Sequence, residues 1–209
     1  MKNPSQNQIS ALEKHAARAD KIAADAARWA SLLDTAQATR LAAQNAFLDT
    51  LDAKGAAALA EADADFHKLT LAAGTVEAAG GPEALRLAAL ESPDAFALFV
   101  AGFEARFAAL NDLRKVALRS LAARRAEATE AGETNPFAVD DLPAVRKARE
   151  AADSIDNATS VALVAKGYAD SRRIGQRVVH RPFNELLDLL RAPLPVVPDA
   201  APTPSASKW

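Results

Sequence analysis

Four phenylalanines lie on one face of a single predicted helix, and this feature limits the fold of the chain more than any other. They are three or four residues apart, which is the spacing of one buried face of an α-helix. Smaller apolar residues continue the face and complete the predicted core seam: Phe96, Phe99, Phe103, Phe107, Leu110, Leu113 and Leu121. Each buried phenylalanine contributes roughly 2 to 3 kcal/mol. Other helices must therefore cover this seam.

Both ends of this helix carry residues with known positional preferences. Ser92 suits an N-cap, Pro93 suits the first helical position, and Asp94 complements the positive end of the helix dipole. Gly132 is a stop signal. We therefore predict a helix over residues 93–131.

The N-terminal part of the chain has a helical seam made mostly of alanine. From Ser5 onward, apolar residues recur at steps of three and four, which predicts a long helix. Alanine buries little area, so this helix depends on packing against others. Gly55 leaves two alternatives open, because the apolar pattern continues in phase through it, while a Lys-Gly pair also suits a C-cap. The helix extends over either 5–54 or 5–79.

The second half of the chain contains a further long helix, a break and a tail. A loop that begins at Gly132 ends at Asp140 or Asp141, either of which could cap a helix over residues 141–180. Arg181 precedes a proline, and that position disfavours helix. We predict a helical bundle over 1–181, a short amphipathic helix over 182–191 and an extended Pro/Ala-rich tail over 192–209.

The predicted fold class is all-α. The two best-defined helices have about 40 residues each, which corresponds to about 60 Å at a rise of 1.5 Å per residue. Similar lengths favour antiparallel pairing. The expected architecture is an elongated antiparallel helical bundle with coiled-coil-like packing and a Pro-rich C-terminal tail.

The sequence offers no set of residues typical of catalysis or cofactor binding. The chain of 209 residues has no cysteine, which excludes thiolate nucleophiles and cysteine-based metal sites. Asp63 and His67 have the spacing of two metal ligands on one helix face, but no second pair accompanies them. No phosphate loop, nucleophile elbow or zinc-protease motif is present. We expect a non-enzymatic protein without a metal or other cofactor.

The sequence also lacks the features of a membrane or secreted protein. No uncharged run approaches the roughly 20 residues of a membrane span. The first residues lack an apolar signal core. We expect a protein without a signal peptide or transmembrane segment, located in the cytoplasm or within a particle assembled there.

Basic residues cluster near the end of the last long helix. The arginines that could contact an anionic partner are Arg172, Arg173, Arg177 and Arg181. Clusters of this kind can bind nucleic acid. However, the formal net charge is -2, and few aromatic residues are interleaved to stack on bases. We therefore favour a protein partner, either a second copy or another subunit, over nucleic acid.

The short helix that follows Arg181 is the most aliphatic small segment of the chain. Together with the last residue it forms the predicted docking segment: Phe183, Leu186, Leu187, Leu189, Leu190 and Trp209. Leucine-rich helices dock into grooves on partner proteins, although packing on the chain's own core produces the same pattern. The proline-rich tail cannot bury its own apolar residues. We expect the segment to dock on a partner.

Three classes of function fit these observations. We favour a structural or assembly protein, a helical component of a homo-oligomer or of a larger particle such as a bacterial or phage particle. The Ala-rich, cysteine-free composition with an Ala/Pro tail resembles that of phasins, which implies an amphipathic coat on lipid or polymer granules. Such a coat would expose a continuous apolar face, whereas assembly would cover it with protein. A nucleic-acid-associated helical protein is a further alternative, and an enzyme depends on Asp63 and His67 alone.

Overall fold

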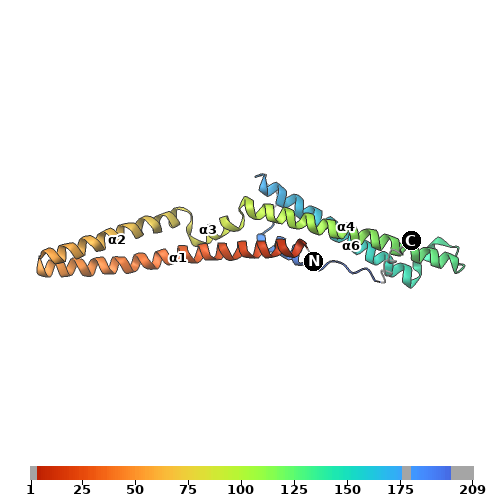
Figure 1. The fold of residues 1–209 in the computed structure, drawn as a ribbon, viewed down its shortest axis with the longest axis horizontal. Coiled ribbons are helices and arrows are strands. Elements are labelled where there is room, and N and C mark those ends of the chain that lie inside the picture. Colours follow the sequence, from red (N-terminus) through yellow and green to blue (C-terminus); the bar gives the residue numbers. More distant parts are fainter. Residues whose placement is uncertain (1–3, 176–179, 199–209) are drawn as a thin grey trace, which may run out of the picture. The chain divides into compact units, whose positions relative to one another are not determined.

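The structure, a computed structural model, describes residues 4–175 and 180–198. Every regular element within these two ranges is a helix, which confirms the predicted all-α fold. The helices, labelled in part in Figure 1, are α1 (Pro4–Thr50), α2 (Ala53–Ala78), α3 (Gly81–Leu90), α4 (Pro93–Glu130), α5 (Pro136–Asp141), α6 (Pro143–Arg173) and α7 (Phe183–Arg191).

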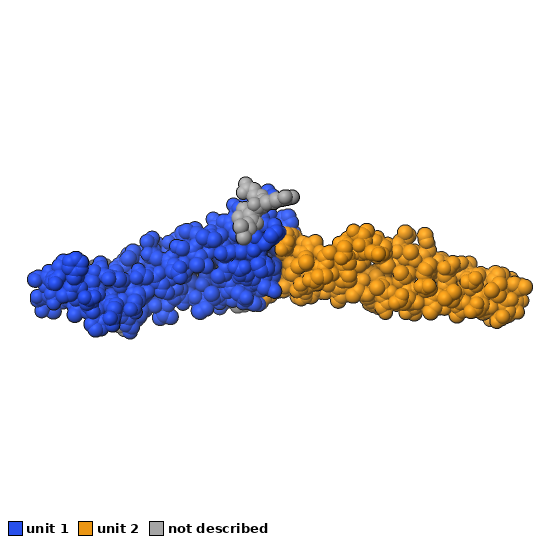
Figure 2. Space-filling view, turned by 180° about the vertical axis from the view of Figure 1, so that it is seen from behind, with its two compact units in different colours: residues 1–12, 93–209 blue, residues 13–92 orange. Residues whose placement is uncertain are grey.

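The chain divides into two compact units, which have different colours in Figure 2. Unit 1 comprises residues 1–12 and 93–209, and unit 2 comprises residues 13–92. The long helix α1 contributes residues to both units. In the order of the sequence, unit 2 is therefore an insertion within unit 1.

In unit 2, α1 and α2 form an antiparallel hairpin whose turn is at Leu51 and Asp52 (Figure 1). Leu51 has a φ of 50°, and the Asp52 carboxylate accepts a hydrogen bond of 2.6 Å from the Gly55 N–H. This N-cap begins α2, so the chain forms two helices here instead of one over residues 5–79. Gly55 suits this position of α2, because a Cβ there would be crowded at 3.2 Å from the Cα atom of Phe47.

The third helix of unit 2, α3, packs beside the N-terminal half of α1. The chain enters α3 through Gly80, whose φ of 88° favours glycine. Arg86 donates a hydrogen bond of 2.6 Å to the Asp20 carboxylate on α1. The His15 imidazole on α1 forms a hydrogen bond with the carbonyl oxygen of Ala89. Polar contacts with α1 therefore hold the C-terminal half of α3.

In unit 1, α4 and α6 lie side by side as an antiparallel pair (Figure 1). Their connection contains the short helix α5, where the sequence predicted only a loop. Asp140 does not cap α6. Its carboxylate instead forms ion pairs with Arg125, at 2.9 Å, and with Arg149. The described part of α6 starts at Pro143, where no side chain caps the helix, and the prediction of a helix starting at residue 141 needs this correction.

The phenylalanine face of α4 contributes to the core of unit 1. The buried members of the predicted core seam are Phe96, Phe99, Phe103, Leu110 and Leu121. Phe107 and Leu113 are only half-buried. Arg106 is buried in place of Phe107, because the buried positions follow a repeat of 3.5 residues and the next one falls three residues after Phe103.

Candidate interaction surface

Unit 2 has almost no core of its own. The only side chains buried among residues 13–92, all of which the structure describes, are Ala19, Ala26 and Leu90. No residue of α2 is buried. Large buried side chains supply most of the hydrophobic stabilisation of a fold, and small units already bury a low fraction of their surface. The surface of unit 2 is therefore the main candidate for an interaction site.

The two helices of the hairpin meet along a thin seam. Its α2 side consists of half-buried residues three or four positions apart: Leu59, Ala62, Phe66, Leu69, Ala73 and Val76. Arg40 of α1 lies over the ring of Phe66, 5.0 Å from its centroid, and forms an ion pair with Asp63. These contacts fix the two helices together without enclosing a large apolar side chain.

The pair of residues considered for metal binding does not form a metal site with other ligands. Asp63 is engaged by Arg40, and His67 is exposed. Within the described ranges, no group of three or more His, Cys, Asp or Glu side chains is placed to hold a metal ion.

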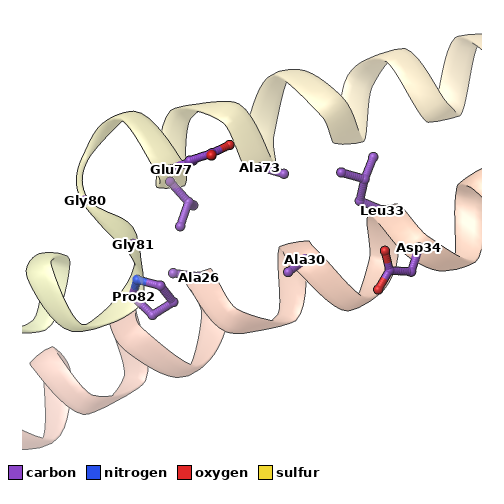
Figure 3. Close-up of a pocket in the computed structure, with 10 residues that line it drawn as sticks. Ala26, Ala30, Leu33, Asp34, Ala73, Glu77, Gly80, Gly81 and Pro82 are labelled. Atoms are coloured by element: carbon purple, nitrogen blue, oxygen red, sulfur yellow. The ribbon is translucent and has the colours of Figure 1, made fainter.

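A groove of about 550 Å³ opens between α1 and α2 near the start of α3. Figure 3 shows small side chains on both walls, Ala26 and Ala30 from α1 and Ala73 from α2. The walls fail to meet because alanine is too short to fill the space between the helices. Asp34 and Glu77 lie at the groove, and neither carboxylate pairs with a basic side chain in the part of the chain described here.

Exposed leucines follow the groove along α1. Leu41, Leu48 and Leu51 are 52%, 60% and 71% exposed. At 100° per residue, Leu41 and Leu48 fall on the same side of α1 as Ala30 and Asp34. We call this face the α1 stripe. Its members are Ala30, Asp34, Gln37, Leu41, Gln44 and Leu48, and all of them are exposed.

The residues predicted to dock on a partner lie instead inside unit 1. Phe183, Leu186, Leu187 and Leu190 of α7 are buried, and only Leu189 is half-buried. A Cβ added to Gly102 of α4 would lie 3.0 Å from a terminal carbon of Leu190. These four side chains are thus used by the chain itself, and this corrects their assignment as an exposed docking surface. Trp209, the remaining member, lies outside the described residues.

Two buried polar groups hold α7 in place. The Tyr168 hydroxyl accepts a hydrogen bond of 2.6 Å from the Arg181 N–H and donates one of 3.1 Å to the Arg181 carbonyl. The Arg106 guanidinium donates to the carbonyl oxygen of Ala192 at 2.6 Å and to those of Leu190 and Pro193 at 3.4 Å. Carbonyls at a helix C-terminus have no backbone partner within the helix. Arg106 therefore closes the end of α7, while burial lowers the pKa of its guanidinium.

The arginines predicted to contact an anionic partner have partners within the chain. The guanidinium of Arg172 lies 5.4 Å from the ring centroid of Phe96. Arg173 forms an ion pair of 2.7 Å with Asp170, and Arg181 forms one of 3.6 Å with Glu185. Arg177 lies outside the described residues. The described arginines do not form one open basic surface.

Comparisons of the chain with protein families, curated proteins and solved structures give no match. Across the two described ranges, no helix combines the length and the apolar character that a bilayer crossing requires. The surface of unit 2 is therefore the feature of the molecule that points to a function.

Proposed function

We propose that this chain is a non-enzymatic structural or assembly protein, a helical component of a homo-oligomer or of a larger particle, in which another protein covers unit 2. The observation that carries the proposal is the core of unit 2, which contains only Ala19, Ala26 and Leu90 as buried side chains. Residues 13–92 form a long, ordered hairpin that buries little apolar surface. A neighbouring protein would supply the missing apolar contact.

The regular spacing of the half-buried residues supports coiled-coil-like packing as the mode of assembly. Steps of three and four along both α1 and α2 present ridges that a third or fourth helix can match. Unit 1, with its buried phenylalanines, would provide the stable base. Protein subunits, either identical or different, are therefore the partners that we favour.

The alternative of a granule coat is less well supported by the exposed surface. A lipid-binding face is expected to be continuously apolar, but Asp34, Gln37 and Gln44 interrupt the leucines of the α1 stripe. Polar residues at intervals within an apolar seam are common where helices of proteins meet, since they fix the register. Nucleic acid gains no support from the arginines of α6, because Arg172 and Arg173 contact Phe96 and Asp170.

Hydrogen exchange combined with sedimentation tests this function on the full chain. At low concentration, amides of α2 are expected to exchange much faster than those of α4, because few buried contacts oppose local opening. Assembly at higher concentration, or addition of a partner subunit, is expected to protect α2. A monomer at tens of micromolar in which α2 is protected as strongly as α4 would overturn the proposal. Protection that arises only with phospholipid vesicles would favour the granule coat.

A further inference from the structure

The α1 stripe has a groove at one end and two exposed leucine side chains, Leu41 and Leu48, further along the helix. The groove beside Ala30 is lined on the α1 side by Ala26, Ala30 and Leu33, with Asp34 at its edge. Leu41 and Leu48 project from the same stripe and are 52% and 60% exposed. Ala30 and Leu41 are eleven residues apart, which is about 16 Å along the helix at 1.5 Å per residue. One face of α1 thus carries both a groove and a side chain of the size that a groove accepts.

We propose that a second copy of this chain docks antiparallel on the α1 stripe, so that Leu41 of each copy enters the groove beside Ala30 of the other. The inference rests on the proposed assembly function and names its partner and surface. The contact is isologous, because a two-fold axis midway between Ala30 and Leu41 brings each leucine to the other copy's groove. Each of the two copies therefore contributes its α1 stripe to the contact.

The register of this pairing follows from the sequence. If Ala30 faces Leu41 of the other copy, then Ala23 faces Leu48 and Asp34 faces Gln37. Large side chains meet small ones at each apolar position, which is the complementarity that close helix packing requires. The Gln37 amide can donate a hydrogen bond to the Asp34 carboxylate, which forms no ion pair within residues 4–175 and 180–198.

A parallel arrangement in register is much less favourable. It would bring Asp34 against Asp34 of the other copy, and like charges at contact repel. It would also place Leu41 against Leu41 and leave the groove empty. The sequence of the stripe therefore selects the antiparallel orientation.

The size of the contact corresponds to a weak, concentration-dependent dimer. A pairing that extends over residues 23–48 of both copies is about 39 Å long. With a helix diameter of about 10 Å, its projection covers roughly 400 Å² on each copy. Side-chain relief makes the accessible area larger than the projection, toward the roughly 600 Å² per partner at the low end of stable interfaces. Such a dimer would also cover Leu41 and Leu48, two of the exposed leucines of unit 2.

Cysteine cross-linking between two differently tagged variants tests the register, and the chain has no cysteine of its own. Ala30→Cys and Leu41→Cys proteins are mixed and oxidised, and the products are separated by mass. The mixture is expected to yield at least tenfold more disulfide-linked dimer than either variant alone. The control replaces Leu41→Cys by Leu71→Cys. Leu71 is 61% exposed on the face of α2 opposite the hairpin seam, and its mixture with Ala30→Cys is expected to give only background.

Sedimentation provides an independent readout that needs no cross-link. Leu41→Asp is expected to weaken self-association at least tenfold, whereas Leu71→Asp should change it by no more than about twofold. Cross-linking of Leu41→Cys with itself would place position 41 opposite position 41 of the other copy and overturn the inference. An oligomer without any cross-link between positions 30 and 41 would overturn it too, but would leave the assembly function intact. If the chain stays monomeric and its α2 amides become protected only when a different subunit is added, the inference of a self-docking surface is overturned and the assembly function stands.

Discussion

The ring of Phe183 meets the ring of Phe99 edge to face, with centroids 5.0 Å apart and an angle of 69° between the planes. This contact joins α7 to the phenylalanine face of α4. Aromatic pairs in this geometry contribute about 0.5 to 1.5 kcal/mol beyond the burial of their area. The short helix after Arg181 is therefore part of the core of unit 1, and its removal would open that core.

Phe99→Ala is expected to lower the free energy of unfolding by about 3 to 5 kcal/mol, since the ring is fully buried and the change leaves a cavity. Chemical denaturation measures this as a lower midpoint. The matched control is Phe137→Ala, because Phe137 is 83% exposed and its loss should cost less than about 0.5 kcal/mol. A small loss for both variants would contradict the placement of Phe99.

Two glycine-to-alanine changes in unit 1 are expected to have opposite effects. At Gly167 a Cβ meets nothing within 4 Å, so Gly167→Ala should stabilise the protein by about 0.5 to 1 kcal/mol through helix propensity. At Gly102 it would lie 3.0 Å from Leu190 and 3.3 Å from Gln8. Overpacking costs about 1 to 3 kcal/mol, which exceeds the propensity gain. Thermal unfolding of the pair checks the sign, and stabilisation by Gly102→Ala would show that Leu190 is not packed there.

Arg106→Lys is expected to destabilise unit 1 by about 1 to 3 kcal/mol, although it keeps the charge. An ammonium group cannot reproduce the planar set of donors that reaches three carbonyl oxygens. Arg119→Lys is the control, since Arg119 is exposed on the same helix. Equal midpoints in urea for both variants would show that the contacts of Arg106 with the end of α7 contribute nothing to stability.

Asp140 is expected to make the stability of unit 1 depend on pH in the acid range. Partial desolvation opposes ionisation, but hydrogen bonds from Arg149 and Arg125 outweigh it and hold the pKa of the Asp140 carboxyl below its usual range. Because the pKa is lower in the folded state, this stabilisation is present above about pH 4 and is lost as the pH falls through the folded value.

The measurement for Asp140 compares the wild-type chain with Asp140→Asn. The variant should be the less stable protein at pH 7, and the two should converge as the pH falls toward 3. Asp112→Asn is the control, since Asp112 forms an ion pair with Lys115 on an exposed helix face. A stability difference that stays constant between pH 7 and pH 3 would show that the ion pairs of Asp140 are not responsible.

The helical fold could be predicted because its signals are local. The spacing of Phe96, Phe99 and Phe103 and the signals at Ser92 and Pro93 lie within a few turns of one another. The burial of Arg106 could not be read in the same way, because its carbonyl partners lie 84 to 87 residues away. A strict 3.5-residue repeat after Phe103 would have indicated the position, but not the reason for an arginine there.

The position of α7 was ambiguous for a related physical reason. An aliphatic helix face such as that of Leu186 and Leu190 is equally suited to the chain's own core and to a groove on a partner, and only the three-dimensional structure distinguishes them. The position of the hairpin turn could not be predicted for a similar reason. The apolar pattern continues in phase through Gly55, and the residue that caps α2 is Asp52, three residues earlier. The groove between α1 and α2 has no sequence signal beyond its alanines.

The hydrogen bonds between Tyr168 and the backbone of Arg181 give the chain a built-in optical reporter. Tyr168 is the sole tyrosine, and its phenol is buried where α7 begins. Undocking of α7 would transfer this chromophore to water and shift its near-ultraviolet absorption. Trp29 lies in unit 2 and is 39% exposed, so in a Trp209→Phe variant its fluorescence would follow that unit alone. Two wavelengths would then record the unfolding of the two units separately in a single titration.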